Sequence, residues 1–75
     1  MTPYFSGNNL IIKGDKNIPV ENSNLEILDL SGRVLFTKRI DNNGSNRIPV
    51  DLPQGVYICT IENTNLTISQ KLIKN

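Results

Sequence analysis

The sequence contains no histidine, no tryptophan and no alanine, and it has one cysteine, Cys59. One cysteine excludes an internal disulfide, and without histidine the chain also lacks the usual ligand sets of transition-metal sites. The same absences exclude the Ser/His and Cys/His pairs of nucleophilic enzymes. The acidic residues stand singly, so no two carboxylates are neighbours in sequence for acid and base catalysis. We therefore expect no cofactor, no metal and no enzymatic activity.

Charge of one sign and long apolar runs are also scarce. The chain has 8 basic and 7 acidic residues and a net charge of +1, so it lacks the basic surplus that nucleic acid binding needs. No apolar stretch approaches the roughly 18 residues of a membrane span. Met1-Thr2-Pro3-Tyr4-Phe5 lacks the charged start and the apolar segment of a secretory signal peptide. These observations argue against nucleic acid as a partner and against direct insertion into a membrane.

The residues that are abundant, namely isoleucine, leucine, valine, threonine and asparagine, favour strands and turns over helices. Short apolar or alternating segments separated by turn residues predict strands at Asn9–Lys13, Leu25–Leu30, Arg33–Ile40, Ile48–Leu52, Val56–Glu62 and Leu66–Lys74. Ile18–Val20 would add another, which Pro19 restricts to an edge. The sequence thus predicts an all-β fold, a small antiparallel immunoglobulin-like β-sandwich of six to seven strands.

The apolar pattern also predicts where some strands lie. Val56–Glu62 is apolar on both faces, and Leu25–Leu30 is apolar on parts of both, so both are expected inside a sheet. Val34, Phe36 and Ile40 are expected to share a face, which Lys38 interrupts near its end, where its side chain can reach water.

Two turns can be predicted from the conformational preferences of their residues. Asp29-Leu30-Ser31-Gly32 fits a type I turn in which Gly32 supplies a positive φ and closes a bulged hairpin. In Leu52-Pro53-Gln54-Gly55, proline presets its own φ at the second position of a turn, and Gly55 tolerates the left-handed conformation at the fourth.

Two side chains of Val56–Glu62 have both a chemical and a structural interpretation. Cys59 is expected to be a buried apolar residue, because a reactive thiol needs a cationic neighbour and none is near in the sequence. Tyr57 is expected to pack in the core with its hydroxyl bonded at the rim, the alternative being a ring that stacks on a ligand.

The last predicted strand ends in Lys71, Leu72, Ile73 and Lys74, and no acidic side chain follows Glu62. Lysines on an exposed strand can block edge-to-edge aggregation. The alternative is that another protein docks on this strand, which offers backbone donors, side chains for pockets and charge for orientation. The residues alone leave both interpretations open.

Three segments together resemble one family: Leu28–Leu35 (LDLSGRVL), Leu52–Glu62 (LPQGVYICTIE) and Lys71–Lys74 (KLIK). In order and spacing they are similar to the C-terminal sorting domain of type A cargo proteins of the type IX (Por) secretion system of Bacteroidota. The resemblance runs from about Leu10 to Lys74. It implies a small immunoglobulin-like β-sandwich at the C-terminus of a larger secreted protein, acting as a secretion signal and not as a catalyst.

The resemblance also implies partners and site residues. In such systems the cargo passes through the periplasm, and the sorting domain is recognised by the translocon, including an outer-membrane β-barrel shuttle protein. A sortase-like cysteine peptidase removes the domain, and the cargo stays at the cell surface or is secreted. When the family pattern is carried over to this chain, the residues expected to be recognised by the partner are Lys71, Leu72, Ile73 and Lys74. The residues expected to have structural roles at turns are Asp29, Ser31, Gly32, Arg33, Leu52, Pro53, Gly55 and Tyr57.

The N-terminal segment departs from the family, in which many relatives have Pro-Asn-Pro before the first strand. Here Thr2-Pro3-Tyr4-Phe5 stands in that place. We expect residues 1–8 to be the remnant of a linker and residues 9–75 to be the sorting domain, a monomeric domain of a larger cargo. The peptidase cleavage site is then expected near residue 1 or upstream of it.

A second hypothesis is an immunoglobulin-like accessory module that binds carbohydrate or contacts a neighbouring domain. It predicts ligand contacts from loops or from aromatic side chains on a strand face. The aromatic side chains of the chain are Tyr4, Phe5, Phe36 and Tyr57, which are too few for an obvious stacking surface.

Overall fold

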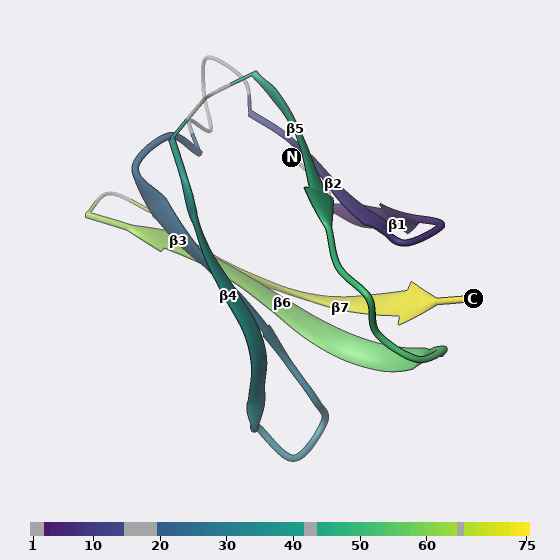
Figure 1. The fold of residues 1–75 in the computed structure, drawn as a ribbon. Coiled ribbons are helices and arrows are strands. Elements are labelled where there is room, and N and C mark those ends of the chain that lie inside the picture. The colour runs from purple at the N-terminus through teal and green to yellow at the C-terminus, as the bar shows by residue number, and fades with distance from the viewer. Residues whose placement is uncertain (1–2, 15–19, 42–43, 65) are drawn as a thin grey trace.

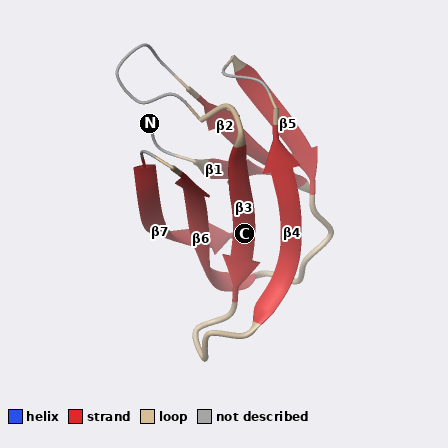
Figure 2. Cartoon of the chain, turned by 90° about the vertical axis from the view of Figure 1, so that its left-hand side faces the viewer, coloured by secondary structure: helices blue, strands red, loops and turns tan. Residues whose placement is uncertain are grey.

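Two antiparallel sheets form the structure, a computed structural model that describes residues 3–14, 20–41, 44–64 and 66–75. The strands in this part of the chain are β1 (Tyr4–Ser6), β2 (Asn9–Lys13), β3 (Ser23–Leu28), β4 (Val34–Ile40), β5 (Ser45–Pro49), β6 (Gly55–Asn63) and β7 (Leu66–Lys74). One sheet has the order β1-β2-β5 and the other β4-β3-β6-β7. Figure 1 shows the two sheets as separate layers, and Figure 2 shows β7, β6, β3 and β4 side by side. The predicted all-β fold and small sandwich are confirmed.

The core lies between the sheets and follows from alternation along the strands, because every second side chain of a strand faces inward. Its buried members are Leu10, Ile12, Val20, Leu25, Ile27, Ile40, Ile48, Val50, Tyr57, Cys59, Ile61 and Leu72. Burial of one aliphatic side chain of this size stabilises a fold by about 1.5–3 kcal/mol. The rings of Phe5 on β1 and Tyr57 on β6 meet edge to face, with centroids 6.1 Å apart, and join the two sheets.

The strands expected inside a sheet are there. β3 lies between β4 and β6, and β6 lies between β3 and β7. β5, which ends at Pro49, is at an edge of the three-stranded sheet, where a residue without an N–H is tolerated. β7 is at an edge of the other sheet.

The first strand was not predicted from the sequence. Tyr4–Ser6, which the sequence pattern leaves in a linker remnant, forms β1 and pairs antiparallel with β2. Gly7, at a φ of 59°, and Asn8 connect the two strands. A Gly-Asn pair between two short runs is a hairpin signal, but a strand of three residues has too few positions to show alternation. The domain boundary after residue 8 stays a prediction.

Val34 lies on the opposite face from the one predicted. The pairing of β3 with β4 shifts after Ile27, so that Ile27 pairs with Phe36 whereas Leu28 pairs with Val34. The extra residue in β4, Leu35, packs against the core, and Val34 is 46% exposed. A β-bulge redirects side chains in this way because two residues of one strand oppose a single residue of its partner.

The possible strand Ile18–Val20 lies outside the described residues except for Val20, which is buried. Across the described ranges, no helix is long and apolar enough to cross a membrane.

Candidate functional site

β7 is the edge strand that holds the predicted recognition residues. It pairs with β6 along its whole length, from Leu66 opposite Asn63 to Lys74 opposite Gly55. On its other side, no strand of the described chain pairs with it. Such an edge presents backbone N–H and C=O groups that a strand of another protein can use.

The four predicted recognition residues divide between the two faces of the sheet. Leu72 and Lys74 face the inside of the sandwich, and each is 6% exposed. Lys71 and Ile73 face outward, and Ile73 is 65% exposed. The division follows from the two-residue period of a strand. Only one lysine and one isoleucine of this segment are therefore accessible to a partner.

Lys74 is a buried lysine with two oxygen acceptors. Its Nζ donates to the carbonyl oxygen of Leu52 at 2.6 Å and to Oδ1 of Asn8 at 2.9 Å. Burial of an ammonium group is costly unless its donors are satisfied, and these contacts use two of the three. Figure 1 shows the β1–β2 turn and the segment before β6 on either side of the C-terminal end of β7. Lys74 therefore connects three segments that are distant in sequence.

The turn before β6 packs against the same end of β7. Tyr57 pairs with Leu72, and its hydroxyl donates to the carbonyl oxygen of Pro53 at 2.6 Å. The predicted structural role of Tyr57, packed in the core with its hydroxyl bonded, is confirmed. A hydrogen bond from a strand tyrosine back to the preceding turn fixes the chain direction there, as in the tyrosine corner of sandwich domains.

Gly55 does not use the left-handed conformation that a glycine at this turn position tolerates. It is the first residue of β6 and pairs with Lys74, whereas the described glycines with positive φ are Gly7 and Gly32. The ring of Tyr57 folds back over it, and the Tyr57 hydroxyl oxygen lies 3.6 Å from the point where a Cβ of residue 55 would be. The turn is instead held by the tyrosine hydroxyl.

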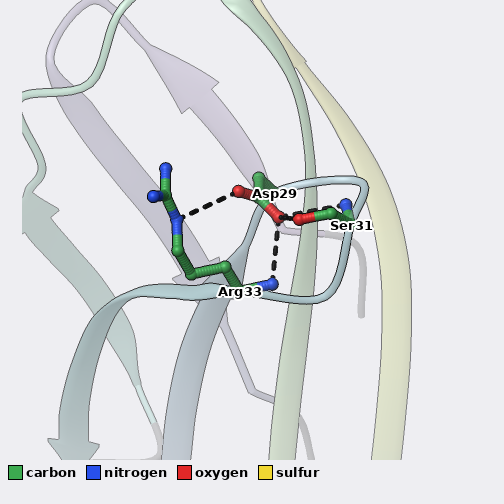
Figure 3. A network of polar contacts seen from close by, with 3 residues as sticks. All are labelled: Asp29, Ser31 and Arg33. Atoms are coloured by element: carbon green, nitrogen blue, oxygen red, sulfur yellow. Dashed lines mark hydrogen bonds and ion pairs between the residues drawn. The ribbon is translucent and has the colours of Figure 1, made fainter.

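The Asp29 turn is a local polar network (Figure 3). Oδ1 of Asp29 accepts hydrogen bonds from the Ser31 hydroxyl at 2.6 Å, from the Ser31 N–H at 3.0 Å and from the Arg33 N–H at 2.9 Å. Oδ2 of Asp29 faces Nε of Arg33 at 3.3 Å. Gly32 has a φ of 93°, and its N–H donates to the Asp29 carbonyl at 3.1 Å, as the predicted turn requires.

This network lowers the pKa of Asp29 below its ordinary value of 3.8. The Ser31 hydroxyl contributes most, followed by the Arg33 N–H. Because the pKa of the folded state is the lower one, the network stabilises the fold fully above the ordinary pKa. That stabilisation is lost as the pH falls through the folded-state value.

The structure brings the turn Leu52–Gly55 and the terminal segment Lys71–Lys74 together, whereas the Asp29 turn lies elsewhere. Figure 1 shows the Asp29 turn at the tip of the β3–β4 hairpin, away from the C-terminal end of β7. One residue of the assembled site, Asn8, was missed by sequence reasoning. The signal that would have found its turn is the Gly7-Asn8 pair.

The described residues include neither a reactive thiol nor a cluster of metal-ligating side chains. Burial raises the pKa of the Cys59 thiol to about 12, so it stays protonated and unreactive at neutral pH. Within the described part of the chain, no group of three or more metal-ligating side chains comes together.

A shallow hollow of about 560 Å³ lies at the other end of β6 from Gly55. Its described lining is Glu21, Asn22, Asn24, Arg39, Glu62, Asn63 and Thr64. This lining includes no aromatic ring, which the hypothesis of a carbohydrate-binding module would need for stacking.

Comparison with known families gives a match over most of the chain. A family model described as "Secretion system C-terminal sorting domain" matches residues 6–75, which is nearly the whole chain. None of the curated proteins compared with the chain matches it.

Proposed function

The chain belongs to the family of secretion system C-terminal sorting domains, and from that premise we propose that the type IX translocon and its outer-membrane β-barrel shuttle protein recognise it as the signal of a larger cargo protein. A type IX sorting domain implies export of its cargo across the outer membrane, to the cell surface or into the medium. The domain travels through the periplasm with the cargo, and a sortase-like cysteine peptidase then removes it. The domain itself is a signal and performs no catalysis.

The observation that carries the proposal is the free edge of β7. Its backbone groups on that side have no strand partner in the described chain, and Lys71 and Ile73 project outward beside them. Strand addition uses these features: main-chain hydrogen bonds supply affinity, and alternate side chains supply specificity. An exposed edge is otherwise a liability for aggregation, and it persists more readily where a partner uses it.

The test is export of a reporter. All 75 residues are fused behind a fluorescent protein that carries a periplasmic export signal, in a bacterium with a type IX system. We expect the reporter to reach the surface, and a version without residues 71–75 to stay in the periplasm. Surface delivery is measured by the accessibility of the reporter to external protease and by cell fractionation.

The deletion also removes packed side chains, so it needs a control for folding. Ile61→Ala removes buried core contacts and is expected to cost about 2–5 kcal/mol, yet it keeps the terminal segment intact. Under the proposal, the Ile61→Ala reporter is exported better than the truncated one. Normal surface delivery of the truncated reporter would contradict the proposal.

A further inference from the structure

The outer face of the four-stranded sheet is divided into an apolar half and a polar half. Strand register places the outward side chains in rows that run across the sheet. The two rows nearest the end of β7 are Ile73–Val56 and Lys71–Ile58–Leu28–Val34. The next two rows are Ser69–Thr60–Glu26–Thr37 and Thr67–Glu62–Asn24–Arg39. We call the first two rows the apolar outer patch.

The apolar outer patch is accessible to solvent. Ile73 and Val34, at its two sides, are 65% and 46% exposed, and the apolar side chains between them are partly exposed. A continuous exposed apolar surface on a small domain marks an interaction site or a site of aggregation.

The β-bulge in β4 determines which apolar side chain of that strand belongs to the patch. In a regular strand without the bulge, Leu35 would pair with Leu28, and Val34 would have the same inward orientation as Phe36. The bulge instead places Val34 opposite Leu28 on the outer face, whereas Leu35 packs against the core.

The charge of the patch indicates what would cover it. Lys71 lies in the same row as Ile58, and no ion pair involves Lys71 within the described residues. The carboxylates of the outer face, Glu26 and Glu62, belong to the polar rows. A partner with an apolar surface and a carboxylate opposite Lys71 is therefore the complementary one.

We propose that the apolar outer patch is the docking surface of the domain for a protein of the export machinery, and that the partner presents an apolar surface with a carboxylate facing Lys71. The proposal rests on the function proposed above, and the patch is continuous with the free edge of β7 through Lys71 and Ile73. Within the terminal segment, Lys71 and Ile73 contact the partner, whereas Leu72 and Lys74 hold β7 on the domain.

The experiment compares substitutions on the two halves of the same face in the reporter fusion. Ile73→Asp and Val34→Asp place a carboxylate in the patch, and Thr67→Asp and Thr37→Asp place one in the polar rows of the same two strands. We expect surface delivery to fall about tenfold or more for the two patch variants, which corresponds to about 1.4 kcal/mol of lost binding. Delivery of the two control variants is expected to stay unchanged. Thermal unfolding of the purified chains, followed by circular dichroism, should show all four folded at the growth temperature of the bacterium.

The charge is tested at one position. Lys71→Glu is expected to lower delivery more than Lys71→Gln, because glutamate repels the proposed carboxylate whereas glutamine only removes the attraction. Equal effects of the two substitutions would overturn the carboxylate on the partner.

The outcomes separate this inference from its premise. If the unsubstituted chain is exported and the patch variants are delivered as well as the controls, the docking surface is wrong and the proposed function stands. If the unsubstituted chain does not reach the surface, the proposed function fails and this inference fails with it. Light scattering measures the oligomeric state of the purified chains. If the unsubstituted chain is a dimer and the Ile73→Asp variant is a monomer, the patch binds a second copy of the chain and the proposal is overturned. The reporter contains no natural cargo, so docking of a cargo domain on the patch does not explain a loss of export.

Discussion

Lys71 and Lys74 are the same residue type three positions apart, and strand alternation gives them opposite surroundings. Lys71 is exposed, whereas Nζ of Lys74 is enclosed between Leu52 and Asn8. An exposed lysine contributes little to stability. A buried one leaves its acceptors unsatisfied when it is removed, and each buried acceptor without a partner costs free energy.

This difference predicts unequal effects of the same substitution. Lys74→Met should lower the free energy of unfolding by about 1–3 kcal/mol, since the Leu52 carbonyl and Asn8 Oδ1 lose their donor. Lys71→Met should change it by about 0.5 kcal/mol or less. Urea denaturation of the two purified variants measures both values. A loss of about 0.5 kcal/mol or less for Lys74→Met would show that the contacts of Lys74 do not stabilise the domain.

The inward orientation of Leu72 and Lys74 could be read from the alternation alone, but the role of Lys74 could not. A lysine at the end of a strand ordinarily reaches water through its long side chain. Its acceptors here come from residue 8 and residue 52, so the contact depends on how the sheets stack. No local pattern in the sequence encodes such a contact.

Among the connecting elements, two glycines that look alike in sequence have different requirements. Both stand where the chain enters a strand after a turn, and the pattern predicts a positive φ at Gly32 and allows one at Gly55. Gly32 has a φ of 93°, whereas Gly55 is already part of β6. A Cβ at residue 32 would meet open space, so only the backbone conformation restricts that position.

Alanine at the two positions separates these requirements. Gly32→Ala should lower the free energy of unfolding by about 1–2 kcal/mol, because an L-residue is strained at that φ. Gly55→Ala should leave it unchanged or raise it by up to about 1 kcal/mol, because the unfolded chain loses freedom and the new Cβ meets the Tyr57 ring at ordinary contact distance. Thermal or urea unfolding of the two variants measures both changes in stability. A greater loss at Gly55 would mean that the ring of Tyr57 does not tolerate a methyl group beneath it.

Strands and their central or edge positions were predictable from the sequence where the signal is long and periodic. β6 and β7 have nine residues each, which is enough to show alternation and to fix their ends within a residue or two. The β-bulge at Leu35 was not predictable, because Val34, Leu35 and Phe36 are all apolar and fit either face. β1 was missed because it is three residues long. The accessible half of the terminal segment follows from the period of β7, but the side chain that stands opposite Leu28 in the apolar outer patch depends on the bulge.

At the scale of the whole molecule, one end of the sandwich is closed by segments from the start, middle and end of the chain. The β1–β2 turn, the turn before β6 and the C-terminal end of β7 meet at Lys74. The Asn8 carbonyl also accepts from the Val50 N–H at 2.8 Å, which ties the first turn to the residue after β5. β1 adds the edge-to-face contact of Phe5 with Tyr57. The region that presents the recognition segment therefore includes the first residues of the chain.

This closure gives a test of the boundary after residue 8. A chain of residues 9–75 lacks β1, the half-buried ring of Phe5 and one acceptor of Lys74, and we expect its free energy of unfolding to be lower by at least about 2 kcal/mol. Phe5→Ala in the full chain should reproduce part of this loss, whereas Tyr4→Ser, at a side chain that is 47% exposed, should cause little. Urea denaturation compares the chains. Equal stability of residues 9–75 and residues 1–75 would support the boundary drawn from the sequence. A loss of the expected size would place β1 inside the domain, because removing a true linker leaves the core and the contacts of Lys74 intact.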